Sequence, residues 1–188
     1  MKKLLLLLVA VLAASSLALA ADTYAIDGAH SSAAFAVKHL GISTVHGRFA
    51  DVSGTILFDA QAPEKSSVTA VIKSASLTTD NAQRDKHLNS EDFFDTAKYP
   101  EIRFQSTSVR KEGDDKFVAV GMLTIRDVTK QVEIPFTLAQ GKGSKGESRL
   151  GVEGALTVTR YDYHVSWDST GALVGKDVRI ELNVEAVK

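Results

Sequence analysis

Hydrophobic and polar positions alternate along most of the chain, which is the period of a β-strand with one buried face. The clearest example is the segment 131–138, where Val132, Ile134, Phe136 and Leu138 alternate with other residues, most of them polar. Turn residues separate the segments that show this pattern, which are 31–40, 45–58, 68–72, 101–109, 116–125, 131–138, 150–158 and 178–187. An apolar face and a polar face on nearly every strand indicate an antiparallel sheet that contacts water on one side.

The number and spacing of these segments are typical of a closed barrel or of a two-sheet sandwich. Alternation alone does not separate the two architectures. We favour an all-β, eight-stranded antiparallel barrel, because closure leaves no edge strand unpaired. The chain shows no internal repeat and no second domain, so a single barrel domain is expected over residues 21–188.

The segment 45–58 cannot be a regular strand over its whole length. Phe58 follows Phe49 by an odd number of positions, so the two would point to opposite faces of one continuous strand. An inserted residue near 51–54 would bring both side chains to the same face. We therefore predict a β-bulge there, close to Gly54.

The segment 84–106 departs from the alternation and carries helix signals. Arg84, His87 and Leu88 share one helix face, and Asp80 is a candidate N-terminal cap. Pro100 forces Tyr99 into extended geometry, and strand-like alternation then resumes. The pattern predicts a short helical insertion between the third and fourth strands.

The same segment carries a family resemblance. Its pattern R-D-x-H-L-x-S-x-D-F-F-D-x-x-x-Y-P-x-I-x-F-x-S resembles the signature of the YceI-like family, as do D-G-A-H-S-S-A-A-F-A-V-K-H-L-G at 27–41 and G-M-L-T-I-R-D-V-T-K at 121–130. The resemblance spans nearly all of the chain after residue 21. It implies a secreted, lipocalin-like barrel with a lipid-filled interior, of a kind implicated in binding polyisoprenoids. The match is looser at 159–167, so no role is transferred to His164.

The first twenty residues have the features of a secretory signal peptide. Lys2 and Lys3 precede an apolar run at 4–12, and Ala18-Leu19-Ala20 matches a cleavage site. We expect cleavage after Ala20 and a periplasmic protein with no stable membrane insertion. Residues 1–20 are thus the predicted signal peptide, and residues 21–188 the barrel domain.

The net charge and the residue types exclude several classes of partner and reaction. The formal net charge is −1, and removal of the two signal-peptide lysines lowers it to −3, so no nucleic-acid partner is expected without a basic patch. The chain contains no cysteine, which excludes disulfides and thiol catalysis. No G-x-S-x-G motif is present, and we expect neither catalytic residues nor a cofactor. A monomer and a homodimer both agree with the polar outer face.

The interior of an eight-stranded barrel is either filled by side chains or wide enough for one small ligand. Small residues at strand positions favour a cavity, although they could also relieve crowding at bends: Ala34, Ala36, Ala70, Ala119, Gly121, Gly151 and Gly154. The inward positions are apolar, so we expect a long isoprenoid or fatty-acyl chain there. The candidate ligand-binding residues are Phe35, Val37, Ile72, Ile102, Phe104, Ala119, Leu123, Ile134, Phe136, Val152, Ile180 and Leu182. A barrel filled by its own side chains, with a purely structural role, is the competing hypothesis.

Polar residues near one end of the barrel are candidates for binding a head group: His30, His39, Arg84 and His87. Arg84, His87 and Asp92 could hold a phosphate, or they could dock the helical insertion so that Leu88, Phe93 and Phe94 plug the end.

A metal-binding protein or metal-dependent enzyme is the alternative function. A symmetric hairpin would place His39 opposite His46, with their Cβ atoms about 4.5–5.5 Å apart, and His30, His87 or Asp27 could add a third ligand. The other interpretation is a hydrogen-bonded pair without a metal.

Overall fold

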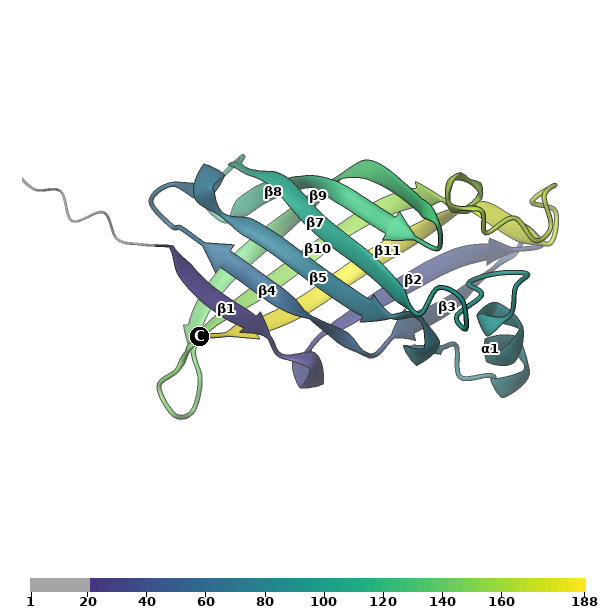
Figure 1. The fold of residues 1–188 in the computed structure, drawn as a ribbon, viewed down its shortest axis with the longest axis horizontal. Coiled ribbons are helices and arrows are strands. Elements are labelled where there is room, and N and C mark those ends of the chain that lie inside the picture. Colours follow the sequence, from purple (N-terminus) through teal and green to yellow (C-terminus); the bar gives the residue numbers. More distant parts are fainter. Residues whose placement is uncertain (1–20) are drawn as a thin grey trace, which may run out of the picture.

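The computed structural model describes residues 21–188, and the predicted signal peptide lies outside them. Eleven strands and one short α-helix make up the described chain (Figure 1). The strands are β1 (Asp22–Ile26), β2 (Ser32–His39), β3 (Ser43–Phe49), β4 (Val52–Phe58), β5 (Ser67–Lys73), β6 (Leu77–Thr78), β7 (Glu101–Lys111), β8 (Lys116–Ile125), β9 (Val128–Lys142), β10 (Ser148–Thr159) and β11 (Val174–Val187). The helix α1 spans Ala82–Asn89, and short 3₁₀ turns lie at Gly28–His30, Pro63–Lys65, Ser74–Ser76 and Arg160–Tyr163.

These strands form one closed antiparallel barrel. The sheet order is β1-β4-β5-β7-β8-β9-β10-β11-β2-β3-β6, and an additional β1–β11 pairing closes the ring. Three pairs of elements, β1 with β2, β3 with β4 and β5 with β6, act as interrupted long strands. Both β1 and β2 pair with β11, the pair β3 and β4 lies next to β1 and β2, and β5 and β6 pair with β4 and β3 on the far side. Counting each pair once gives eight strands, and α1 lies between the third and the fourth. The predicted fold class is confirmed.

The segment 45–58 differs from the prediction. It is two strands rather than one strand with a bulge, because Ala50 and Asp51 lie outside the ladder. The interruption changes the parity in the predicted sense: Phe49, Val52 and Phe58 are all buried. The register of β4 against β5 is unbroken at Gly54, where a β-carbon would come within 2.0 Å of the carbonyl oxygen of Thr69. Gly54 therefore permits close strand approach and does not mark a bulge.

The buried side chains form two clusters at opposite ends of the barrel. The C-terminal-end cluster comprises Tyr24, Ile56, Phe58, Val109, Phe117, Ala119, Leu138, Leu150 and Ala186. The helix-end cluster comprises Phe49, Leu77, Phe93, Ile102, Leu123, Ile125, Val158, Tyr163 and Val165, and Leu88 of α1 packs against it. Among residues 21–188, no helix has the length and hydrophobicity needed to cross a membrane.

Ile134 tests which strand faces point inward. Its side chain is 7 % exposed, so Ile134→Asp places an unpaired carboxylate in the apolar interior and should lower the free energy of unfolding by at least about 3 kcal/mol. The exposed Gln131 on the same strand is the matched control, and Gln131→Asp should change stability by less than about 0.5 kcal/mol. Urea unfolding of both variants gives the comparison. An unchanged midpoint for Ile134→Asp would mean that the two faces of β9 are assigned the wrong way round.

Candidate functional site

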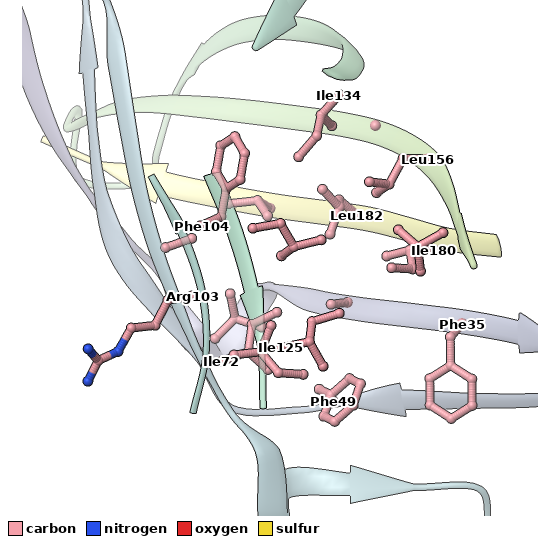
Figure 2. A pocket seen from close by; sticks show the side chains of 18 of the residues that line it. Phe35, Phe49, Ile72, Arg103, Phe104, Ile125, Ile134, Leu156, Ile180 and Leu182 are labelled. Carbon is pink, nitrogen blue, oxygen red and sulfur yellow. The ribbon is translucent and has the colours of Figure 1, made fainter. Parts of the chain in front are cut away.

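The barrel encloses an apolar cavity of about 220 Å³. No polar surface faces it, although a few polar residues contribute carbon atoms to its border. All twelve side chains proposed from the sequence border the cavity: Phe35, Val37, Ile72, Ile102, Phe104, Ala119, Leu123, Ile134, Phe136, Val152, Ile180 and Leu182. Figure 2 shows several of them converging on the space, whereas the guanidinium of Arg103 points away from it.

The cavity is elongated along the barrel. It borders Phe58 and Leu138 of the C-terminal-end cluster, and it also borders Phe93 and Tyr163 of the helix-end cluster. Its border thus runs from one end cluster of the barrel to the other. Its shape suits one extended chain better than a compact ligand.

The small strand residues have two different roles. Ala70, Ala119 and Gly154 border the cavity from the inward face, so their small size leaves space there, whereas Ala34 is on the outward face of β2, opposite Arg48 and Glu181. Gly121 does not border the cavity. A β-carbon at this position would come within 2.4 Å of the carbonyl oxygen of Gln105, so the glycine here relieves crowding between strands. Ala36 and Gly151 are absent from the cavity border, and a β-carbon at Gly151 would meet no atom within 4 Å, so neither role applies to Gly151. The cavity and the relief of crowding are therefore both present in one barrel.

The helical insertion covers one end of the cavity. Leu88, Phe93 and Phe94 border the cavity from this insertion. Asn81, and not Asp80, caps α1, with its side chain accepting from the backbone N–H of Arg84 at 3.0 Å. Leu88, Phe93 and Phe94 all reach the interior, so the geometry supports the hypothesis that the insertion plugs this end of the barrel.

The two proposed head-group residues on α1 are engaged in bonds that hold the insertion. Arg84 donates from Nε to Thr79 Oγ1 at 2.7 Å and from Nη2 to the carbonyl oxygen of Thr79 at 2.8 Å. His87 Nε2 lies 2.9 Å from Asp92 Oδ2, and its ring packs edge-on against Phe93 and Trp167. Neither residue borders the cavity.

Arg126 connects the plug to the segment that follows β10. Its Nη1 donates to the carbonyl oxygen of Phe93 at 2.8 Å and to that of His164 at 2.6 Å. Trp167 packs against Phe93 with ring centroids 5.4 Å apart. The insertion and the segment 160–173 thus form one cover over this end.

Arg160 organises that second segment, and sequence reasoning missed it. It is 5 % exposed and donates to the backbone carbonyl oxygens of five residues at 2.6–2.9 Å: Val165, Trp167, Asp168, Val174 and Gly175. Burial lowers its pKa from the usual value. No periodic pattern marks an arginine whose partners are backbone carbonyls.

Asp168 completes the loop. Its carboxylate accepts from Thr170 Oγ1 at 2.6 Å, from the N–H of Leu173 at 2.7 Å and from the N–H of Val174 at 2.9 Å. These bonds, led by the one from Thr170, lower the pKa of Asp168 to about 2. The ionised carboxylate therefore holds the turn that leads into β11.

The predicted pairing of His39 with His46 is wrong. His39 lies opposite Ser43, and His46 lies opposite Ala36, because the turn at 40–42 is shorter than a symmetric hairpin between the two histidines requires. The shift of register also sends the two side chains to opposite faces of the sheet. The two histidines therefore cannot form a common metal site.

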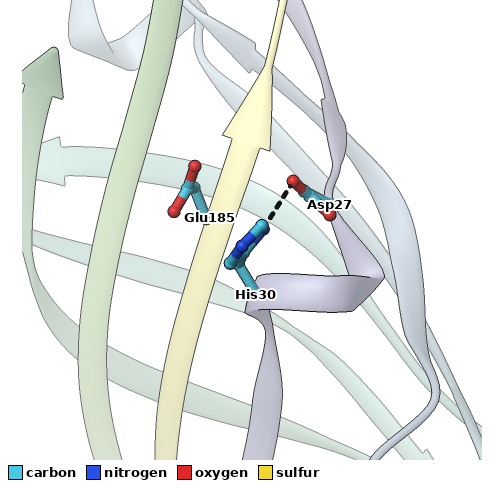
Figure 3. A group of neighbouring side chains, drawn as sticks. All are labelled: Asp27, His30 and Glu185. Atoms are coloured by element: carbon cyan, nitrogen blue, oxygen red, sulfur yellow. Dashed lines mark hydrogen bonds and ion pairs between the residues drawn. The ribbon is translucent and has the colours of Figure 1, made fainter. Parts of the chain in front are cut away.

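The structure places His30 in a different cluster, with Asp27 and Glu185 (Figure 3). One potential ligand atom from each of the three residues lies within 4.8 Å of the others, which is compatible with a metal ion. However, Arg149 Nη1 donates to Asp27 Oδ2 at 3.2 Å and also to Glu185 Oε1. A guanidinium already neutralises these carboxylates, so the geometry favours an ion-pair network.

The pKa values of this network agree with ion pairing. The hydrogen bond between His30 Nδ1 and Asp27 Oδ2, at 2.9 Å, lowers the pKa of Asp27 and raises that of His30. The carboxylate of Glu185 raises the pKa of Arg149. These groups lie where β1 turns into β2, beside β10 and β11, and none of them borders the cavity.

Comparison with known proteins gives a family match over most of the chain. The model of the YceI-like domain matches residues 24–186. A UPF0312 protein of Pseudomonas savastanoi pv. phaseolicola is 44 % identical over 151 residues, which are 79 % of this chain and 78 % of that protein.

Two solved structures share the fold. Burkholderia cenocepacia BcnA superposes with a TM-score of 0.78 at 24 % identity, covering 85 % of this chain and 98 % of that one. A domain from Saccharophagus degradans, described as a polyisoprenoid binding domain implicated in plant cell wall breakdown, superposes with a TM-score of 0.69 at 15 % identity, covering 87 % of this chain and 97 % of that one.

Arg160→Met should loosen the segment 160–173, because five backbone carbonyls lose their donor. We expect a loss of at least about 3 kcal/mol in the free energy of unfolding and faster proteolysis within this segment. Arg160→Lys should restore little of this stability, since the compact ammonium group of lysine cannot donate to as many carbonyl oxygens as the planar guanidinium of arginine. The exposed Arg179 supplies the control, Arg179→Met, whose proteolysis and urea midpoint should match the parent. A parental cleavage pattern in Arg160→Met would contradict the assigned role.

Asp168 should make stability dependent on pH in the acid range. Its folded pKa of about 2 lies below the ordinary 3.8, so its contribution is complete above about pH 4 and is lost as the pH falls towards 2. The measurement is the melting temperature of the parent and of Asp168→Asn at a series of pH values from about 6 down to about 2. The parent should melt at the higher temperature at neutral pH, and the difference should shrink below about pH 4. A difference that stays constant across this range would rule out the ionised carboxylate as its source.

Proposed function

The chain belongs to the YceI-like family, and on that premise we propose that it binds one long apolar lipid chain, polyisoprenoid or fatty-acyl, inside its barrel. The observation that carries the proposal is the elongated cavity with no polar surface. Such a cavity offers no hydrogen bond to a ligand, so a polar group placed in it would lose its hydration without compensation. A hydrocarbon chain carries no such cost.

The binding energy would come from burial of hydrocarbon. Each methylene transferred from water to this lining contributes about 0.8 kcal/mol, so a chain of a few isoprene units binds with useful affinity without any polar contact. Chain type would then be selected by the width and length of the cavity. The description of the Saccharophagus domain as polyisoprenoid binding agrees with this chemistry. At 15 % identity, the similarity between that domain and this chain is one of fold.

The proposed setting is the periplasm, where a long apolar lipid needs a carrier to cross water. The signal-peptide pattern in residues 1–20 supports this setting. We propose a binding or carrier role without catalysis. His30 and His87 are held in hydrogen bonds at separate places, and the titratable residues on the cavity border, Arg103, Arg160 and Tyr163, present no polar surface to it.

The identity of the ligand is best tested on protein purified from its natural compartment. Native mass spectrometry followed by organic extraction should recover an isoprenoid or acyl lipid at about one per protein chain. Empty protein that also takes up neither prenyl nor acyl fluorescent probes would contradict the proposal.

Ala119→Phe should fill part of the cavity. Ala119 is 4 % exposed and lies between Val109 on β7 and Ile134 on β9. We expect probe affinity to fall by at least about tenfold, which corresponds to the loss of a few buried methylenes, with a stability change of no more than about 3 kcal/mol. The exposed Ala139 provides the matched control, and Ala139→Phe should bind like the parent. Parental affinity in Ala119→Phe would mean that the lipid binds elsewhere.

A further inference from the structure

A small group of apolar side chains projects into solvent at the end of the barrel that carries α1. We name it the apolar tip, and it consists of Leu40, Ile42 and Leu173, which are 48 %, 84 % and 45 % exposed. Leu40 and Ile42 belong to the turn between β2 and β3, and Leu173 immediately precedes β11. The N–H of Leu40 donates to the carbonyl oxygen of Leu173 at 2.9 Å, so the two segments are joined. β2 ends on the same side of the barrel as α1 (Figure 1).

Neither the turn geometry nor burial accounts for leucine at position 40 and isoleucine at position 42. Leu40 and Gly41 both have positive φ, 53° and 71°, and the N–H of Ile42 donates to the carbonyl oxygen of His39 at 3.1 Å. A tight turn of this kind favours Asn, Asp or Gly where Leu40 stands, because leucine is strained in the left-handed region. An isoleucine that is 84 % exposed gains no burial from the fold. The apolar character of the tip therefore points to a contact outside the chain.

The apolar tip lies next to the cavity border. Val174, which follows Leu173, borders the cavity, and so does Val37, three residues before Leu40. A surface that holds the apolar tip would therefore also hold this end of the cavity close to it.

Basic groups accompany the apolar tip. Lys38 and Lys176 border a shallow hollow together with Tyr161, Thr170, Gly171, Gly175 and Asp177. The Nζ of Lys38 donates to Thr44 Oγ1 at 3.1 Å, while the carboxylate of Asp177 accepts from Thr159 Oγ1 at 3.0 Å. Ammonium groups beside exposed aliphatic side chains match the phosphates above the hydrocarbon of a bilayer.

We propose that the apolar tip inserts into the surface of a phospholipid bilayer that contains anionic lipids, and that it docks this end of the barrel there. The inference rests on the proposed function, because docking brings the cavity border to the source or destination of a lipid chain. A second copy of the chain fits less well, since a specific protein interface buries about 800 Å² per partner and the apolar tip presents only three protruding side chains. A projecting turn is, by contrast, suited to shallow insertion.

The test is flotation with vesicles of phosphatidylcholine and phosphatidylglycerol, comparing the parent with Ile42→Asp. A carboxylate at the apolar tip should reduce the vesicle-bound fraction by at least about tenfold. The control is Met122→Asp, because Met122 is 37 % exposed but lies on the wall strand β8, and its flotation should equal that of the parent. Lys38→Gln combined with Lys176→Gln should weaken binding only when phosphatidylglycerol is present.

A second measurement separates docking from lipid binding. Uptake of a fluorescent prenyl probe dispersed in buffer should be the same for Ile42→Asp and the parent, whereas uptake from vesicles should be slower for the variant. Equal flotation of the two proteins, or no flotation of the parent, would overturn the docking proposal. Self-association of the parent that Ile42→Asp abolishes, without vesicle binding, would assign the apolar tip to a protein contact instead. Failure of the parent to take up the dispersed probe would overturn the proposed function itself.

Discussion

The pairing of β11 with β10 on one side and with β1 and β2 on the other closes the barrel, and the remaining features depend on that closure. A closed ladder satisfies the backbone hydrogen bonds of the wall without an exposed edge. It also separates the two faces of every strand into an inside and an outside. Apolar alternation, which in an open sheet would only produce a packed face, here produces an enclosed hydrocarbon-like interior.

The size of the strand residues decides how far that interior is filled. Large side chains gather in two clusters towards the ends, and the small residues Ala70 and Gly154 border the space along with them. Protein interiors normally pack as densely as organic crystals, so an apolar cavity represents stabilisation that the fold has given up. A bound hydrocarbon chain would recover it. Binding of such a chain would therefore stabilise the barrel, since the chain would supply the missing contacts.

The two ends of the barrel are built by different means. The C-terminal-end cluster consists of strand residues, among which Leu150 and Ala186 are completely buried. At the other end, the cover consists of non-strand segments that Arg126 and Arg160 hold through backbone carbonyls. Hydrogen bonds to loops open at lower free energy than a packed cluster of strands. The cover at the helix end is therefore expected to open more readily than the C-terminal end, and the helix end also carries the apolar tip.

The sequence by itself determined most of the strands and their inward faces, because a side-chain period of two depends only on neighbouring residues, and the break in that period placed the helical insertion. For the same reason, all twelve proposed interior residues could be named in advance. The sequence did not predict the short strands β1 and β6. The tertiary structure alone decided the break at Ala50, the separation of His39 from His46 and the role of Arg160. These features depend on register, on turn length and on backbone carbonyls that the fold brings together. Such contacts leave no periodic trace in the order of the residues.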